Sequence, residues 1–135
     1  MVSIDEMQTL LDGIAESLPD QFYTQLNGGI ILMPQAKRDR RKGGEGLYIL
    51  GEYYRGRNLG RYIAIYYGSF ERVYGHLPKD QLAEQLAATL KHEFRHHLES
   101  LAGEHGLEIE DELFLADYMR RQASRKYQSD TNREV

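Results

Sequence analysis

A run of leucines at helical spacing is the feature that most constrains the fold of this chain. From about Lys79 to about Leu101, apolar residues recur every three or four positions, at Leu82, Leu86, Leu90, Phe94 and Leu98 or Leu101. This period places them on one face of an α-helix, where they can pack against a core. We therefore predict one long helix with a buried stripe. Gly103 and Gly106 are expected to end it, because glycine is common at the C-terminal end of a helix.

The same helix carries the pattern H-E-x-x-H at residues 92–96. His92 and His96 lie one turn apart on one helix face, so both imidazoles can reach a single zinc ion at roughly 2.0–2.1 Å. Glu93 points to a neighbouring sector, where it can accept a proton from a metal-bound water without ligating the metal. His97 lies about 100° from His96 around the helix. We expect it to be buried or to support the site rather than to share the metal.

Length and composition indicate one domain. We assign residues 1–127 to a single domain and residues 128–135 to a frayed polar tail. The chain has no cysteine, which excludes disulfides and thiolate metal sites. No apolar run approaches the ~20 residues that span a bilayer, and the N-terminus lacks a secretory signal pattern, so we expect a cytoplasmic protein without a membrane partner. The net charge of −4 makes nucleic acid an unlikely main partner.

Local patterns predict helices first, then strands, then helices again. Ser3 and Glu6 form a capping box that opens the first helix. Pro19 opens a second, short helix, and Gly29 to Met33 reads as a strand. Two β-rich runs joined by a glycine-containing turn, Leu47 to Tyr54 and Arg61 to Tyr67, predict an antiparallel hairpin in which alternating tyrosines pack across the strands. A helical turn from Ser69 to Tyr74 and a last helix from about residue 109 to Lys126 complete the order.

Residues 35–46 lack any periodicity. Their lysines and arginines all lie between residues 37 and 42. One interpretation is a contact with phosphate or nucleic acid. The other is a solvated loop, which we favour because blocks of like charge are usually solvated.

These residues together resemble the minimal zincin-like metallopeptidases, short bacterial proteins built around an H-E-x-x-H-H core. That family's strand motif L-x-G-x-Y-x-G is matched loosely by residues 49–56, and a second strand ending in tyrosine is matched by Ile63 to Tyr66. The resemblance covers roughly residues 15–120. It implies an α+β, zincin-like fold in which a small, mostly antiparallel sheet packs against the long H-E-x-x-H helix and flanking helices. It also implies one bound zinc ion and a hydrolytic site.

The chain departs from that family after the second histidine. Where the family has a glycine and then an acidic ligand, this chain has Glu99 and Ala102. The segment from Ile109 to Leu113 resembles the family's stretch around its acidic ligand, which makes Asp111 the expected third metal ligand. An acidic residue at the start of a helix is also favoured by the helix dipole alone. The other candidates for this position are Glu99, Glu104, His105 and Glu108.

The expected activity is hydrolysis of peptide bonds in a peptide or protein substrate, with Glu93 as general base and zinc held by His92, His96 and Asp111. The resemblance also implies that the strand at 61–67 pairs with an extended substrate, if that strand is the sheet edge beside the cleft. Two alternatives belong to other classes. One is a zinc-binding interaction module with little or no peptidase activity, and the other is an RNA-associated metallohydrolase that holds phosphate with the basic segment 37–42.

Overall fold

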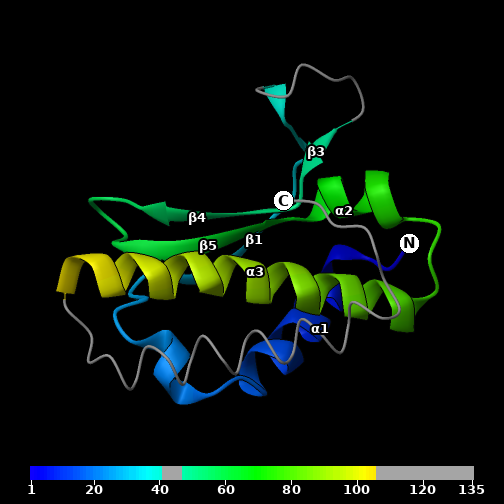
Figure 1. Cartoon of the computed structure of the whole chain (residues 1–135). Helices are drawn as coiled ribbons and strands as arrows, with labels where there is room; N and C mark the ends of the chain where they lie inside the picture. The colour runs from blue at the N-terminus through cyan, green and yellow to red at the C-terminus, as the bar shows by residue number, and fades with distance from the viewer. Residues whose placement is uncertain (41–46, 106–135) are drawn as a thin grey trace.

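A helix of 27 residues, α3 (Lys79–His105), runs along one face of a small sheet (Figure 1). The computed structural model describes residues 1–40 and 47–105, except for the side chains of Glu104 and His105. The fold is α+β, as predicted. Within the described residues, no helix is long and apolar enough to cross a membrane. The expected last helix, Asp111 and the expected tail lie outside the described residues.

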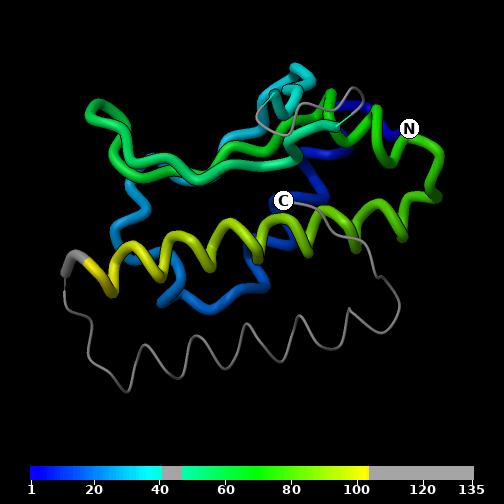
Figure 2. The backbone as a smooth tube through the Cα atoms, turned by 45° about the horizontal axis from the view of Figure 1, so that its top comes forward, coloured from blue at the N-terminus to red at the C-terminus, as the bar shows by residue number. Residues whose placement is uncertain are grey.

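The main sheet has three strands in the order β1 (Gly29–Met33), β5 (Arg61–Tyr66) and β4 (Gly51–Arg55). β4 and β5 form the predicted antiparallel hairpin, but β1 runs parallel to β5, so this sheet is mixed rather than mostly antiparallel. Substrate pairing by the strand at 61–67 depended on its lying at the sheet edge, and this strand, β5, is central. The edge beside α3 is therefore formed by β4, and Figure 2 shows the sheet and the helix as two adjacent layers.

A second, two-stranded sheet projects from the end of the first (Figure 1). It pairs β2 (Lys37–Arg38) with β3 (Tyr48–Ile49) in antiparallel register. Lys37 and Arg38 belong to the segment that we expected to be loop throughout, and this part of the prediction was wrong. A strand of two residues is too short to show any alternation, and its pairing partner lies about ten residues away.

The N-terminal elements follow their local signals. Helix α1 (Ile4–Glu16) begins with the predicted capping box, in which the Ser3 hydroxyl accepts from the Glu6 N–H and the Glu6 carboxylate accepts from the Ser3 N–H. After Pro19, the short helix η1 (Asp20–Tyr23) is a 3₁₀ turn. Both elements lie alongside α3 in Figures 1 and 2. They bury their apolar side chains, among them Met7, Leu11 and Phe22, in the core.

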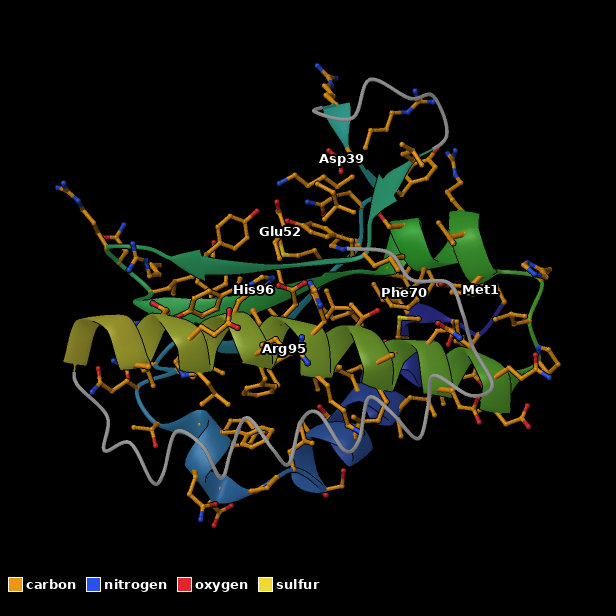
Figure 3. All side chains as sticks on the ribbon, in the orientation of Figure 1. Met1, Asp39, Glu52, Phe70, Arg95 and His96 are labelled. Atoms are coloured by element: carbon orange, nitrogen blue, oxygen red, sulfur yellow. The ribbon has the colours of Figure 1, made fainter. Side chains whose placement is uncertain are left out.

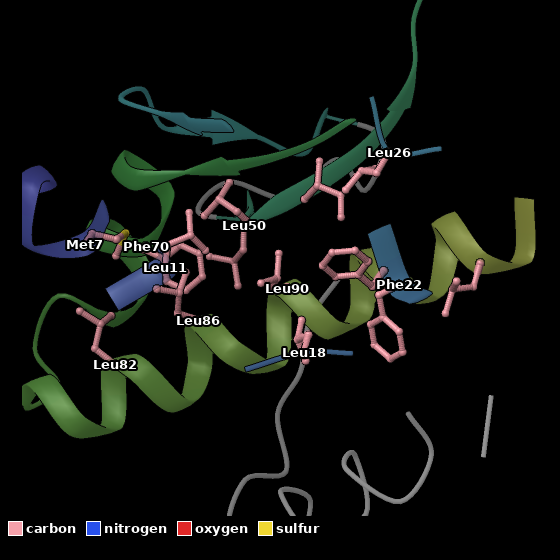
Figure 4. Close-up of a cluster of buried hydrophobic side chains, with 14 residues drawn as sticks. Met7, Leu11, Leu18, Phe22, Leu26, Leu50, Phe70, Leu82, Leu86 and Leu90 are labelled. Atoms are coloured by element: carbon pink, nitrogen blue, oxygen red, sulfur yellow. The ribbon is translucent and has the colours of Figure 1, made fainter. Parts of the chain in front are cut away.

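The core lies between α3 and the sheet (Figure 4). All the predicted stripe residues of α3 are buried: Leu82, Leu86, Leu90, Phe94, Leu98 and Leu101. Ile63 and Ile65 of β5 face them, since alternate residues of a strand point to the same side of a sheet. The other face of β5 contributes Ala64 and Tyr66 to a smaller cluster with Ile49. The stripe thus determines which side of α3 stays open to solvent.

Two helix boundaries differ from the predictions. Helix α2 (Tyr67–Tyr74) follows β5 directly and is longer than the single turn expected from Ser69. Helix α3 continues through Gly103 to His105, so Gly103 does not end it. One glycine inside a helix costs only about 1 kcal/mol relative to alanine, and the buried stripe of α3 outweighs a penalty of this size. Gly106 lies outside the described residues.

Candidate metal centre

His92 and His96 converge on one point beside the sheet. Their Nε2 atoms are 3.2 Å apart, and their rings are perpendicular with centroids 4.7 Å apart. Two nitrogen ligands of a tetrahedral zinc ion, each at about 2.0–2.1 Å, lie about 3.3–3.4 Å from one another. The separation in this structure is close to that value. The predicted pair therefore has the nitrogen spacing that shared coordination of one ion requires, a spacing at which one imidazole can also donate a hydrogen bond to the other.

The environment of His92 keeps its imidazole neutral. Burial lowers the pKa of His92 to about 4, and the neighbouring charges of His96 and Arg95 act in the same direction. A neutral imidazole presents the lone pair that a metal needs, whereas a protonated one does not. His92 therefore meets the chemical requirement for a metal ligand at neutral pH.

Glu93 is almost completely buried, with 3% of its surface exposed. Burial raises the pKa of Glu93 to about 7, and the negative charge of Glu52 contributes to the same shift. A carboxylate that exchanges its proton near neutral pH suits general acid–base catalysis at that pH. Glu93 also lines the same cavity as the two histidines. Its position is consistent with the predicted role of a base that acts beside the metal.

This cavity, which we call the histidine cavity, has a volume of about 550 Å³ and lies between β4 and α3. Figure 3 shows His96 on α3 and Glu52 on β4 beside it. Gly51 permits the close approach of the two elements. A Cβ atom at this position would lie 3.1 Å from both the Ile65 side chain and the Thr89 side chain. The cavity is lined by Ile49, Gly51, Glu52, Tyr53, Arg55, His92, Glu93, His96, Glu99 and Ser100.

His97 is fully buried, as predicted, and does not line the histidine cavity. Its Nε2 lies 2.8 Å from the Thr24 carbonyl oxygen, which can only accept a hydrogen bond, so Nε2 carries the proton. The other ring nitrogen, Nδ1, then accepts from the Tyr53 hydroxyl at 2.9 Å. His97 thus links α3 to β4 and to the segment after η1 by hydrogen bonds. These bonds set the distance between β4 and α3, the two walls of the histidine cavity.

Sequence reasoning missed Glu52, which carries the densest group of polar contacts at the site. Its Oε1 accepts from Lys37 Nζ at 2.5 Å, from the Tyr66 hydroxyl at 2.8 Å and from the Tyr54 hydroxyl. Burial raises the pKa of Tyr66, as do its contacts with Tyr54 and Glu52, so Tyr66 remains a protonated donor. The only signal in the sequence was the alternation that puts Glu52 and Tyr54 on one strand face. The predicted packing of tyrosines is also present, because Tyr54 stacks on Tyr62.

The described residues place no third metal ligand beside the histidine pair. In the part of the chain that the structure describes, no three His, Cys, Asp or Glu side chains are placed to hold a metal ion together. Glu99 lies near Nδ1 of His96, with its Oε1 4.0 Å from that atom, whereas the two histidines approach each other through Nε2. The preferred candidate, Asp111, lies outside the described residues, as do Glu108 and the side chains of Glu104 and His105.

Comparison with known proteins identifies a relative. No family model matches the chain, and no curated protein matches it. A solved structure, that of a conserved hypothetical protein from Thermus thermophilus, matches with 37% sequence identity and a TM-score of 0.66. The match covers 75% of this chain and 98% of the other. This chain belongs to the same family as that protein. Because the relative is described as hypothetical, the function of this chain has to be argued from its site.

A second cavity adjoins the histidine cavity on the side of β2 and β3. It has a volume of about 840 Å³, and we call it the basic pocket. Ile49 and Glu52 line both cavities, so the two meet at the start of β4. Lys37, Arg38 and Arg40, from the basic segment 37–42, line this pocket. Residues 41 and 42 of that segment lie outside the described residues. The lining residues are Ala36, Lys37, Arg38, Asp39, Arg40, Tyr48, Ile49, Glu52 and Arg72.

Proposed function

We propose that this protein is a zinc-dependent metallopeptidase in which Glu93 is the general base. The observation that carries the proposal is the convergence of the His92 and His96 Nε2 atoms, 3.2 Å apart, in a cavity that a buried glutamate also lines. Two neutral nitrogen ligands and an adjacent carboxylate are the parts that metal-assisted hydrolysis requires. The resemblance of the sequence to minimal zincin-like metallopeptidases supports the same assignment.

His92 and His96 would hold the zinc ion, which when bound supplies a lowered pKa for water and polarises a carbonyl group. Glu93 accepts a proton from the attacking water and then delivers it to the amine that leaves when the peptide bond breaks. The wall formed by β4 and α3 lines one side of this open site. The Tyr53–His97 hydrogen bond fixes the spacing of that wall, so the base is held in place beside the histidine pair.

The edge of the sheet offers a place for an extended substrate. Among the described strands, β4 pairs with β5 on one side and with no strand on the other. Its open edge borders the histidine cavity, to which β4 contributes Gly51, Glu52 and Tyr53. A peptide that added to β4 would form main-chain hydrogen bonds along this edge and pass the histidine pair. This role was expected for the strand at 61–67, but that strand is central and has no open edge.

The test is metal analysis followed by a peptidase assay on the full chain. We expect about one zinc ion per chain, and zinc-dependent cleavage of unfolded protein or peptide substrates. His96→Ala should remove both, whereas His76→Ala, an exposed histidine in the loop before α3, should change neither. Zinc bound stoichiometrically without hydrolysis would favour the alternative of a binding module. If wild-type protein supplied with zinc bound no transition metal, the proposal would be wrong.

A further inference from the structure

We propose that the basic pocket binds a carboxylate of the peptide substrate and so selects substrates with an acidic group near the bond that is cleaved. This inference rests on the proposed peptidase function and names its substrate class. Its geometric basis is that the basic pocket and the histidine cavity share Ile49 and Glu52. A peptide that lies along the open edge of β4 can therefore reach both cavities at once. Figure 3 shows Asp39, Glu52 and His96 along this path, from the β2–β3 sheet down to α3.

Arginine side chains supply the recognition chemistry. Arg38 and Arg72 lie over the Tyr48 ring, each with its guanidinium carbon 5.8 Å from the ring centroid. Arg72 also donates one hydrogen bond to the Tyr48 hydroxyl at 3.0 Å. Tyr48 thus orients two guanidinium groups from different elements, β2 and α2. A guanidinium has five N–H donors in a planar fork that matches a carboxylate, so two oriented arginines form a receptor for such a group.

Lys37 has a different role from the arginines. It binds Glu52 through a contact of 2.5 Å, and its charge is balanced there. Lys37 Nζ also lies 5.7 Å and 5.5 Å from the ring centroids of Tyr54 and Tyr66, respectively. This cluster forms the boundary between the two cavities. The pocket also contains the buried carboxylate of Asp39, and its excess of positive charge comes from Arg38, Arg40 and Arg72.

The distribution of charge favours a peptide over a nucleic acid. The basic pocket is lined by four cationic side chains and two carboxylates, whereas the histidine cavity is lined by three carboxylates, Glu52, Glu93 and Glu99, and a single arginine. A polyanion that left the basic pocket along β4 would meet one arginine, Arg55, in the lining of the histidine cavity, and no further row of cations for consecutive phosphates. A peptide with one acidic group needs only the basic pocket. The positive charge is confined to one pocket, as expected for recognition of one anionic group.

The test measures peptide binding without cleavage. The protein carries Glu93→Gln to prevent turnover, and a short, fluorescently labelled peptide of alanine and serine with one central Glu and an amidated C-terminus is titrated with it. We expect this peptide to bind about tenfold more tightly than the matched peptide with Gln, since a charge-assisted hydrogen bond exceeds a neutral one by an amount of this order. A Gln peptide with a free C-terminal carboxylate reports whether a terminal carboxylate can occupy the pocket instead.

Variants assign the preference to the pocket. Arg38→Gln combined with Arg72→Gln should abolish the preference for the acidic peptides, while Arg57→Gln, an exposed arginine in the turn between β4 and β5, should leave it unchanged. Thermal melting establishes that the double variant is folded, and Arg40→Gln alone provides a milder test if it is not. Equal binding of all three peptides by folded parent protein would overturn the proposal.

An RNA oligonucleotide serves as the competing ligand. If it bound more tightly than the acidic peptide, with a strong salt dependence that the double variant removed, the pocket would be a nucleic-acid site and the proposal would be wrong. Because the assay reads binding and not cleavage, it separates the two proposals. A protein that failed to cleave any peptide but still preferred the acidic ones would retain this subsite, while the proposed peptidase activity would be lost.

Discussion

Glu93 combines almost complete burial with a position beside two candidate metal-binding histidines, and this combination leads to a prediction. Glu93→Gln should keep zinc affinity close to that of the wild type, because we propose Glu93 as the base and not as a ligand. Hydrolysis should fall by at least 100-fold, since the amide cannot accept a proton and general base catalysis contributes about 10²–10⁴-fold. The measurements are zinc stoichiometry by elemental analysis and the rate of peptide cleavage at saturating zinc.

The matched control for this variant is Glu84→Gln, an exposed glutamate on the same helix that should keep both properties. Loss of zinc from the Glu93→Gln protein would mean that Glu93 ligates the metal. The proposed role of Glu93 would then have to be abandoned, although the histidine pair could still be a metal site.

Glu52 leads to a prediction about stability and pH. Burial alone raises the pKa of Glu52, but hydrogen bonds from Lys37, Tyr54 and Tyr66 outweigh this effect, and the pKa lies below its usual value. The stabilisation from the ionised form is therefore fully present above about pH 4.3, the usual pKa of a glutamate, and is lost as the pH falls through the lower pKa of the folded protein. Glu52→Gln should lower the free energy of unfolding near pH 7.

The difference between Glu52→Gln and the wild type should shrink as the pH is lowered from about 7 to about 3, because the wild-type carboxylate becomes protonated. Urea denaturation at each pH provides the measurement, and Glu84→Gln should follow the wild type throughout. A difference that stayed constant over this range would show that the charge of Glu52 does not contribute to stability in the folded protein.

At the scale of elements, α3 links the core to the site through Phe94. This side chain stands between the two histidines in the sequence but is fully buried in the core, with its ring centroid 5.5 Å from that of Phe22 and 5.1 Å from that of Tyr23. Phe94→Ala should reduce the free energy of unfolding by about 3–5 kcal/mol, since it leaves a cavity at the contact between α3 and η1. Urea denaturation measures the change.

Leu47→Ala is the matched control for Phe94→Ala, because Leu47 is largely exposed and its substitution should change stability by less than about 0.5 kcal/mol. A similarly small loss for Phe94→Ala would contradict the packing described for this helix. Restoring bulk with Phe94→Leu should recover part of the loss, since the cavity is then smaller.

The elements that could be predicted from the sequence are those whose signal is local. The apolar stripe of α3, the capping box at Ser3 and the hairpin of β4 and β5 each involve residues close together in the chain. The parallel pairing of β1 with β5 joins distant segments, and β2 and β3 have only two residues each, so no local period encodes either pairing. The same reason explains the missed site residue. Glu52 gains its role from Lys37 and Tyr66, which lie on other strands.

At the scale of the whole molecule, the proposed metal centre requires a ligand from a segment outside the histidine pair. In the proposed site the histidine pair would supply two nitrogen ligands, and catalytic zinc sites have three protein ligands and one open position. Within the described residues, no third side chain joins the pair. Helix α3 is described as far as His105, about two and a half turns after His96, so a ligand from later in the sequence requires the chain to return toward the histidine cavity. The resemblance of residues 109–113 to the stretch around the acidic ligand of zincin-like peptidases makes Asp111 our candidate for it.

We therefore predict that Asp111→Ala weakens zinc affinity by more than 100-fold. Loss of a residue that only supports a ligand typically costs about 10- to 100-fold, so a larger loss distinguishes a direct ligand. Glu99→Ala should cost less than this, because its carboxylate lies near Nδ1 of His96 and not near the converging Nε2 atoms. Competition with a chromophoric chelator at pH 7 measures the affinities, with Glu108→Ala as a neighbouring control. If Asp111→Ala bound zinc normally while Glu104→Ala or His105→Ala did not, the end of α3 would supply the ligand, and the resemblance beyond residue 97 would be misleading.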